Sequence, residues 1–412
     1  MLRPSRLLVL TATLTASLLA KELPRPTNPN PGLKYYYPVP KVAEPKTYDF
    51  DVVIYGASPA AVSAAYQAKK MGKSVGIFVF RRHVGGMSSS GLSDVDYGKK
   101  ESIGGMAKTV FLDFFKKQVQ SPAEVETLFL TMLTDLDVPV FFEHRLAQVE
   151  KQGDRLTKLV FENGNSAGPV SLDYVGGSFG WAEGSYEERE RILQDHVNYR
   201  QGYLYFLAND PGIPAELRAR VAQFGPPKKD FPETAGWPHE LYVREGRRLR
   251  GDNVPTEHEC LGKTKVEDSV GLGSFIMDSH VVRRIIYKTA KDAHITHLRT
   301  SKPEEITAAQ LNWQGDMVGL DGQFDYAVPK PYRISYRAIR PKKTECVNLL
   351  VPTVISSTHP AFGSSRMEPV FMILGQSAGA AASLAIDGRL AVQDVDYAKL
   401  RAILLKEGQL LD

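Results

Sequence analysis

The chain has 412 residues, of which 43% are hydrophobic and 24% are charged, and its formal net charge at pH 7 is +4. This length and this balance are typical of a globular protein with more than one domain. The charge is small and no long basic tract occurs, which argues against a nucleic-acid partner.

The first 20 residues have the pattern of a secretory signal peptide. Arg3 and Arg6 precede an apolar run from Leu7 to Ala20 that is too short to span a bilayer, and Ala20 is a small residue suited to cleavage. An uncleaved anchor or a stray apolar helix is the alternative interpretation. The proline-rich stretch 21–47 predicts a linker. We therefore expect a secreted protein with no integral membrane span after cleavage.

Residues 49–80, DFDVVIYGASPAAVSAAYQAKKMGKSVGIFVF, predict a strand, a helix and a second strand. The apolar runs 51–55 and 75–80 are typical of buried parallel strands, and the alanines from Ala60 to Ala68 let the helix lie close to a sheet. Three such elements in about 30 residues are the size of a mononucleotide-binding crossover. A buried crossover without a ligand is the alternative.

The loop that begins the predicted helix departs from the G-x-G-x-x-G pattern of nucleotide-binding loops. Gly56 keeps the first glycine, whereas Ser58 and Ala61 replace the second and third with other small residues. The helix N-terminus still offers free N–H groups to a phosphate. The second strand ends near Val79 without the carboxylate that would bind a ribose.

A glycine pair follows the second strand in RRHVGGMSSSG, residues 81–91. A flavin enzyme needs glycines here, because FAD lies extended and backbone N–H groups must come close to it. Alone, the segment is equally consistent with a surface loop. Directly after a crossover, it favours FAD as the cofactor.

The middle of the chain alternates helical and strand-like patterns. Helices are predicted over 123–136, 186–207 and 215–224, and strands over 138–144 and 156–161 are predicted to pair. Aromatic and basic residues are frequent beyond residue 173, which suits a sugar or a carboxylated substrate. The sequence has no G-x-S-x-G element of a serine hydrolase and no spacing typical of a metal site.

Residues 366–387, RMEPVFMILGQSAGAAASLAID, predict an apolar helix with Pro369 in its first turn. Gly375, Ala378, Gly379 and Ala382 recur at helical spacing and form a second face of small residues. In a flavin enzyme, the positive end of such a helix would stabilise the anionic reduced flavin. An ordinary buried helix is the alternative.

Together these motifs resemble the FAD-dependent oxidoreductases that are often described as xanthan-lyase-like. The opening of that family reads strand, G-G-T-P-A-G, helix, strand, R-H-L-G-G-M. Residues 236–260, 270–280, 331–352 and 356–385 look like later family blocks in the same order. The resemblance covers most of residues 48–412, although the chain looks shortened in its middle.

The resemblance implies an α/β fold in which a Rossmann-like FAD-binding domain is discontinuous in the sequence. We expect the first part of this domain over residues 48–165 and the second part over 340–412. Residues 166–339 would then form an inserted α+β substrate domain.

The resemblance also assigns candidate site residues. Those expected to bind FAD are Gly56, Ala57, Ser58, Pro59, Ala60, Arg82, His83, Gly85, Gly86, Met87, Ser88, Glu368, Pro369 and Gly375. Those expected to contact the substrate are His239, Arg244, Glu245 and Arg366. His258 and His280 are candidates for proton transfer, because a neutral imidazole accepts a proton near pH 7.

The implied function is that of an exported FAD-dependent oxidoreductase. It would transfer a hydride from a small, carbohydrate-derived substrate to N5 of the flavin and pass the electrons to an acceptor that the sequence does not identify. Two alternatives stay open. One is a degenerate, non-catalytic binding protein or an incomplete gene product, and the other is a flavin-containing polysaccharide lyase.

Overall fold

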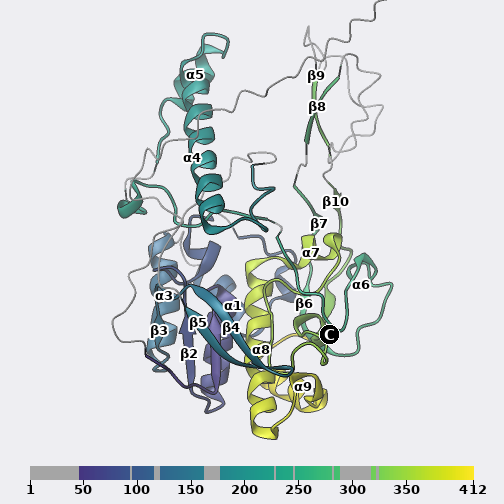
Figure 1. The fold of residues 1–412 in the computed structure, drawn as a ribbon. Coiled ribbons are helices and arrows are strands. Elements are labelled where there is room, and N and C mark those ends of the chain that lie inside the picture. Colours follow the sequence, from purple (N-terminus) through teal and green to yellow (C-terminus); the bar gives the residue numbers. More distant parts are fainter. Residues whose placement is uncertain are drawn as a thin grey trace, which may run out of the picture.

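The computed structural model describes residues 46–92, 95–115, 121–161, 177–226, 229–244, 246–280, 283–287, 317–321 and 324–412 (Figure 1). The predicted signal peptide and the predicted linker up to residue 45 lie outside the described residues.

A parallel sheet begins the fold and confirms the predicted crossover. β1 (Val52–Tyr55), α1 (Pro59–Lys70) and β2 (Val75–Phe78) follow one another, and β3 (Val140–Phe141) pairs with the far side of β2. All four residues of β2 are buried, as expected for the central strand of the order β1–β2–β3. The carboxyl ends of the three strands therefore meet at one edge of the sheet.

One helix that covers this sheet begins with a capping box. α3 (Pro122–Thr134) starts at Ser121, whose side chain accepts a hydrogen bond from the backbone of Glu124, while the Glu124 side chain accepts one from Ser121. Phe129 and Leu133 of α3 are fully buried in a core that α1 and β2 share. The short α2 (Gly105–Ala107) and a π-helical segment (Lys108–Phe114) add to the same core.

The predicted pairing of strands 138–144 and 156–161 is wrong. β5 (Arg155–Phe161) pairs instead with β4 (Leu146–Gln152), and both belong to a separate antiparallel hairpin. The chain turns sharply at Glu143, which has a φ of 62°, so the segment that leaves β3 starts a new strand. Gly153, with a φ of 64°, then makes the hairpin turn between β4 and β5.

Helix α8 (Glu368–Gly388) lies directly against α1, although about 300 residues separate them in the sequence (Figure 1). A Cβ added at Gly375 would collide with the backbone of Ala60, and one added at Gly379 would collide with that of Ala64. The Ser63 hydroxyl donates to the carbonyl oxygen of Met372 at 2.7 Å. Both ends of the chain thus build one core.

Helix α8 is also long and apolar enough to cross a membrane, the one such helix among the residues that the structure describes. However, 78% of its apolar stretch is buried inside the fold. Its apolar character is therefore explained by its place as the central helix of the core.

The rest of the chain adds helices and short antiparallel pairs. The further helices are α4 (Tyr186–Asn209), α5 (Ala215–Val221), α6 (Glu257–Cys260), α7 (His359–Ser365) and α9 (Tyr397–Lys406). The pairs are β6 (Ser269–Gly273) with β11 (Tyr332–Ser335), β7 (Met277–Asp278) with β10 (Asp325–Tyr326), and β8 (Arg283–Tyr287) with β9 (Met317–Asp321). β6, β11 and α9 pack on α8 in a second core cluster.

Candidate active site

The loop that was predicted to bind a phosphate joins β1 to α1. Gly56 has a φ of 104°, a conformation that favours glycine, and an added Cβ would meet nothing within 4 Å. Ser58 takes the N-cap position of α1, but its side chain makes no capping hydrogen bond. The first turn of α1 thus has no side-chain cap, and the space beside Gly56 is open, which suits an anionic group.

The glycine pair lies against this loop. Gly85 and Gly86 have φ values of 114° and 56°, and the Gly85 amide donates to the carbonyl oxygen of Ala57 at 2.6 Å. An added Cβ at Gly86 would lie 3.3 Å from Cα of Ser58. The β1–α1 loop and the glycine-pair segment, which were both predicted to bind FAD, are thus in direct contact.

Glu126 of α3 holds the start of the glycine-pair segment. One of its carboxylate oxygens accepts a hydrogen bond from the Val84 amide at 2.8 Å, and the other lies 3.0 Å from Nδ1 of His83. This anchor fixes the backbone just before Gly85.

No carboxylate stands at the end of β2. Val79, at the position where a ribose-binding acid is expected, is buried and continues the sheet through a hydrogen bond to the carbonyl oxygen of Phe141. The acid that reaches this edge is Glu143, which follows β3 and forms an ion pair with Arg82. Arg82 therefore turns toward a neighbouring strand.

A buried charged cluster lies beside the glycine pair. Arg81 contacts Glu240 at 3.1 Å, and the His239 ring stacks on that of His83 with a centroid distance of 3.6 Å. Burial, together with the positive charges of His83 and Arg81, lowers the pKa of His239 to about 2. His239 is therefore neutral at physiological pH, and it serves here as an aromatic surface.

The N-terminus of α8 carries a buried acid. Burial, and next the charge of Glu240, raise the pKa of Glu368 to about 8, although the positive end of a helix would favour the carboxylate. The Ser88 side chain of the glycine-pair segment opposes this rise through a hydrogen bond to Glu368, which favours the carboxylate. The glycine-pair segment and the start of α8 thus meet at these two side chains.

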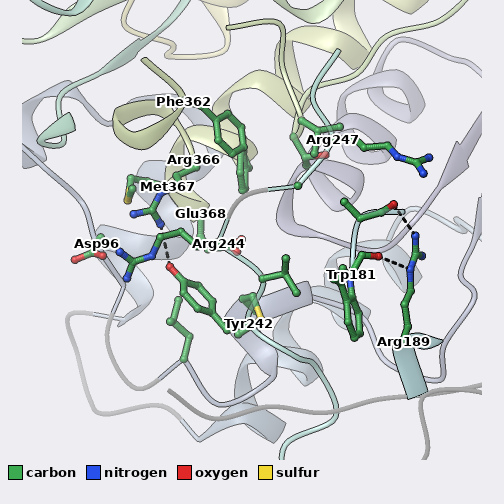
Figure 2. Close-up of a pocket in the computed structure, with 18 residues that line it drawn as sticks. Asp96, Trp181, Arg189, Tyr242, Arg244, Arg247, Phe362, Arg366, Met367 and Glu368 are labelled. Carbon is green, nitrogen blue, oxygen red and sulfur yellow. Dashed lines mark hydrogen bonds between the residues drawn. The ribbon is translucent and has the colours of Figure 1, made fainter. Parts of the chain in front are cut away.

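A pocket of about 400 Å³ opens beside Glu368. Its lining comes from the glycine-pair segment, the chain around α4, residues 242–244 and 246–247, and the start of α8. Figure 2 shows Trp181 and Arg189 on one side, with Glu368, Arg366 and Arg244 on the other. Such a volume suits a small molecule.

A hydrogen-bonded chain orders the Glu368 side of the pocket. Arg366 donates to the Tyr242 hydroxyl at 2.9 Å (Figure 2). It also donates to Asp278 of β7. Nη1 of Arg244 lies 3.6 Å from the other oxygen of Asp278. One carboxylate thus positions two arginines.

The structure brings together only part of the predicted substrate set. Arg244 and Arg366 line the pocket, whereas His239 is buried outside its lining and Glu245 lies outside the described residues. Met87 and Glu368, predicted for the cofactor, also line the pocket.

The two histidines predicted for proton transfer lie elsewhere. His258 is exposed on α6, and His280 follows β7, and neither lines the pocket. Their roles stay predictions. Among the residues that the structure describes, no group of three or more His, Cys, Asp or Glu side chains is placed to hold a metal ion.

Sequence reasoning did not single out Arg189 and Asp278 as site residues. Arg189 looks like an ordinary solvated residue of a polar helix, and Asp278 is one acid in a short strand. No local motif marks either residue, because only the folded chain brings Arg189 into the pocket lining and places Asp278 behind the lining residues Arg244 and Arg366.

A family model described as "FAD dependent oxidoreductase" matches residues 51–171 and 164–404 of this chain. No curated protein matches the sequence. The two matched ranges together span most of the chain, including the β1–α1 loop, the pocket lining and α8.

Similar solved structures cover only parts of the chain. Thioredoxin reductase from Streptococcus pyogenes is 17% identical, with 32% of this chain and 40% of that chain covered and a TM-score of 0.21. A flavin monooxygenase from Stenotrophomonas maltophilia is 18% identical, with 32% and 42% covered and a TM-score of 0.22. THI4 from Thermovibrio ammonificans is 19% identical, with 27% and 46% covered and a TM-score of 0.21. The chain spans less than half the length of each of these proteins.

Proposed function

The chain belongs to the FAD-dependent oxidoreductase family and has FAD as its cofactor, and from this premise we propose that it oxidises a small, carbohydrate-derived substrate in the pocket beside Glu368. The observation that carries this proposal is the meeting of three elements at one place. The glycine pair, the N-terminus of α8 and the pocket share Met87 and Glu368.

The residues present fit an extended dinucleotide. The open space at Gly56 and the uncapped N-terminus of α1 would hold the pyrophosphate, and the Gly85–Gly86 segment would lie along it. Bound FAD would supply a two-electron acceptor that takes a hydride at N5.

The protein itself would orient the substrate and accept its proton. Tyr242 and Arg366 form a polar wall that Asp278 holds in place from outside the lining, and Phe362 and Phe371 supply apolar surface. When a hydroxyl carbon loses a hydride, the hydroxyl loses a proton, and Glu368, one of the two acids that line the pocket, would accept it. Activity would then rise as the pH passes through about 8, where Glu368 ionises.

Export is part of the proposal. The charged start and the apolar run that ends at Ala20 support cleavage of a signal peptide and an extracellular site of action. The electron acceptor would then be an extracellular molecule.

A non-catalytic relative is the second candidate, and two observations favour it. Val79 leaves the end of β2 without a ribose-binding acid, and β1 exposes Val53 and Tyr55 on one face, each at 40% or more. Both features would weaken the hold on a dinucleotide. A flavin-containing polysaccharide lyase has no such support from the described residues.

The test is the visible absorption spectrum of the protein, expressed without residues 1–20, supplied with FAD and desalted. Retained flavin bands that carbohydrate substrates bleach without oxygen would support the oxidoreductase. Gly86→Val should abolish retention, because Gly86 has a φ of 56° and packs on Ser58, whereas Gly225→Val, at an open position, should not. Folded but colourless wild-type protein would favour the non-catalytic relative.

A further inference from the structure

We infer that the substrate of this pocket carries a carboxylate on a ring, and that Arg189 binds the carboxylate while the Trp181 side chain packs against the ring. This inference rests on the proposed function, because it names the substrate class of the same site. It assigns a binding role to a helix, α4, that no motif connects with the cofactor.

The first observation is the number of charged side chains around the pocket. Four arginines are among the lining residues: Arg189, Arg244, Arg247 and Arg366. In the described part of the chain, three carboxylates face them, because Glu183 pairs with Arg247, Asp278 pairs with Arg366, and Asp96 lines the pocket. The lining itself contains four arginines but only two acids, Asp96 and Glu368, so it favours an anionic substrate.

Arg189 is the arginine that is fixed by neutral groups. Its Nε donates to the carbonyl oxygen of Trp181 at 2.9 Å, and its Nη2 donates to that of Ala182 at 3.2 Å (Figure 2). Its Nη1 donates to no group in the described residues. Carbonyl oxygens orient a guanidinium without cancelling its charge, so Arg189 keeps donors and charge for an anion.

The support of Arg189 is rigid. Ser185 and Glu188 form a capping box at the start of α4, one turn from Arg189. The ring of Tyr186 lies 5.7 Å from the guanidinium carbon. Because the arginine is held in place before a ligand arrives, binding costs little side-chain entropy.

Trp181 supplies the second contact. It lines the pocket, and its ring lies 5.9 Å from the Arg189 guanidinium. A flat apolar surface beside a fixed cation fits a ring that bears a carboxylate. The opposite wall holds Glu368 and Arg366, so such a substrate would place its far end against the proposed proton acceptor.

The test measures ligand binding to the FAD-loaded protein by calorimetry. The probes are D-glucuronate, D-galacturonate, benzoate and 4-hydroxybenzoate, each compared with its neutral amide. We expect at least one acid to bind the wild type about tenfold more tightly than its amide, which corresponds to about 1.4 kcal/mol. Arg189→Gln should remove this preference. Arg191→Gln should keep it, because Arg191 lies on the same helix with its side chain 52% exposed and pairs with Asp195.

Arg189→Lys separates charge recognition from support of α4. Lysine keeps the charge but not the paired contacts to the two carbonyls, so we expect it to retain part of the preference for the acid. Equal loss in the Gln and Lys variants would overturn the assignment of Arg189. A wild type that binds no acid more tightly than its amide would overturn the substrate class.

The two proposals fail in different ways. Loss of flavin on desalting, with acid preference intact, would contradict the oxidoreductase but not the carboxylate site. Flavin that is retained and bleached only by neutral substrates, with no acid preference, would contradict the carboxylate site alone.

Discussion

At the residue scale, Glu368 is a carboxyl group that its surroundings keep protonated. Burial and the charge of Glu240 raise its pKa to about 8, against the opposing influence of the α8 N-terminus. An acid whose pKa is higher in the folded than in the unfolded state destabilises the fold wherever it is forced to ionise. Glu368 thus lowers the free energy of unfolding, which is common for residues of a functional site.

We predict that Glu368→Gln raises the melting temperature of the flavin-free protein at alkaline pH. Below about pH 4.5 both states of the wild type hold the proton, and Glu368 does not destabilise the folded state. Between about pH 4.5 and 8 the unfolded state loses the Glu368 proton while the folded state keeps it. The destabilisation of the folded state by Glu368 therefore grows with pH in this range. The difference between variant and wild type should therefore increase from pH 5 to pH 8 and then level off.

Thermal unfolding followed by circular dichroism at several pH values measures this difference. Glu267→Gln is the control, because the Glu267 side chain is 71% exposed and pairs with Lys265 at the surface. Its effect should be small and nearly constant from pH 5 to 9. A pH-independent effect of Glu368→Gln would contradict the raised pKa.

At the element scale, the contact between α1 and α8 depends on small residues on both helices. Alanines of α1 face Gly375 and Gly379 of α8, and each glycine lets the two backbones approach closely. Glycine inside a helix normally costs about 0.5–1 kcal/mol relative to alanine. Close packing of the two helices is the physical reason to keep it here.

We predict that Gly379→Ala destabilises the protein, whereas Gly202→Ala stabilises it. The new methyl group at position 379 would collide with the backbone of Ala64, which we expect to cost about 1–3 kcal/mol. At position 202 of α4 nothing lies within 4 Å of an added Cβ, so the same change should gain about 0.5–1 kcal/mol. Chemical denaturation of both variants gives the two free energies of unfolding, and stabilisation by Gly379→Ala would contradict the close approach of α1 and α8.

Elements with local signals could be predicted from the sequence. The predicted strands of the crossover correspond to β1 and β2, and its predicted helix corresponds to α1. The helices α3, α4 and α8 were also predicted. Apolar periodicity and prolines near helix starts are local features, so a short stretch of sequence is enough to recognise them. The partner of β5 was not predictable in this way. Strand pairing depends on contacts between segments, and the turn at Glu143 has no glycine to mark it.

The candidate site, too, could be predicted only where a local motif marks it. Gly56, Gly85 and Gly86 follow from motifs in a short stretch of sequence, and the structure places them together. The pocket brings together Arg189 and Arg366 from distant parts of the chain, so no spacing in the sequence reveals the pair.

At the scale of the whole molecule, helix α8 joins two core clusters of the described chain. Met372 and Ile373 of α8 belong to the cluster that contains α1, β2 and α3, and the same helix also packs on β6, β11 and α9. A chain of buried amides continues this connection, since Gln376 donates to Gln67 at 3.1 Å and accepts from Gln409 at 2.9 Å. A loss of packing near the C-terminus should therefore reach the cofactor site.

Leu404→Ala tests this coupling at a distance from the pocket. Leu404 of α9 is fully buried, so the change should cost about 2–5 kcal/mol and lower the melting temperature by about 2–6 °C. Leu405, its neighbour, is 44% exposed, and Leu405→Ala should have little effect. If the ends of the described chain form one cooperative unit, flavin release measured by fluorescence and helix loss measured by circular dichroism should shift together in Leu404→Ala. Flavin release at the wild-type temperature, with helix loss at a lower one, would show two independent units instead.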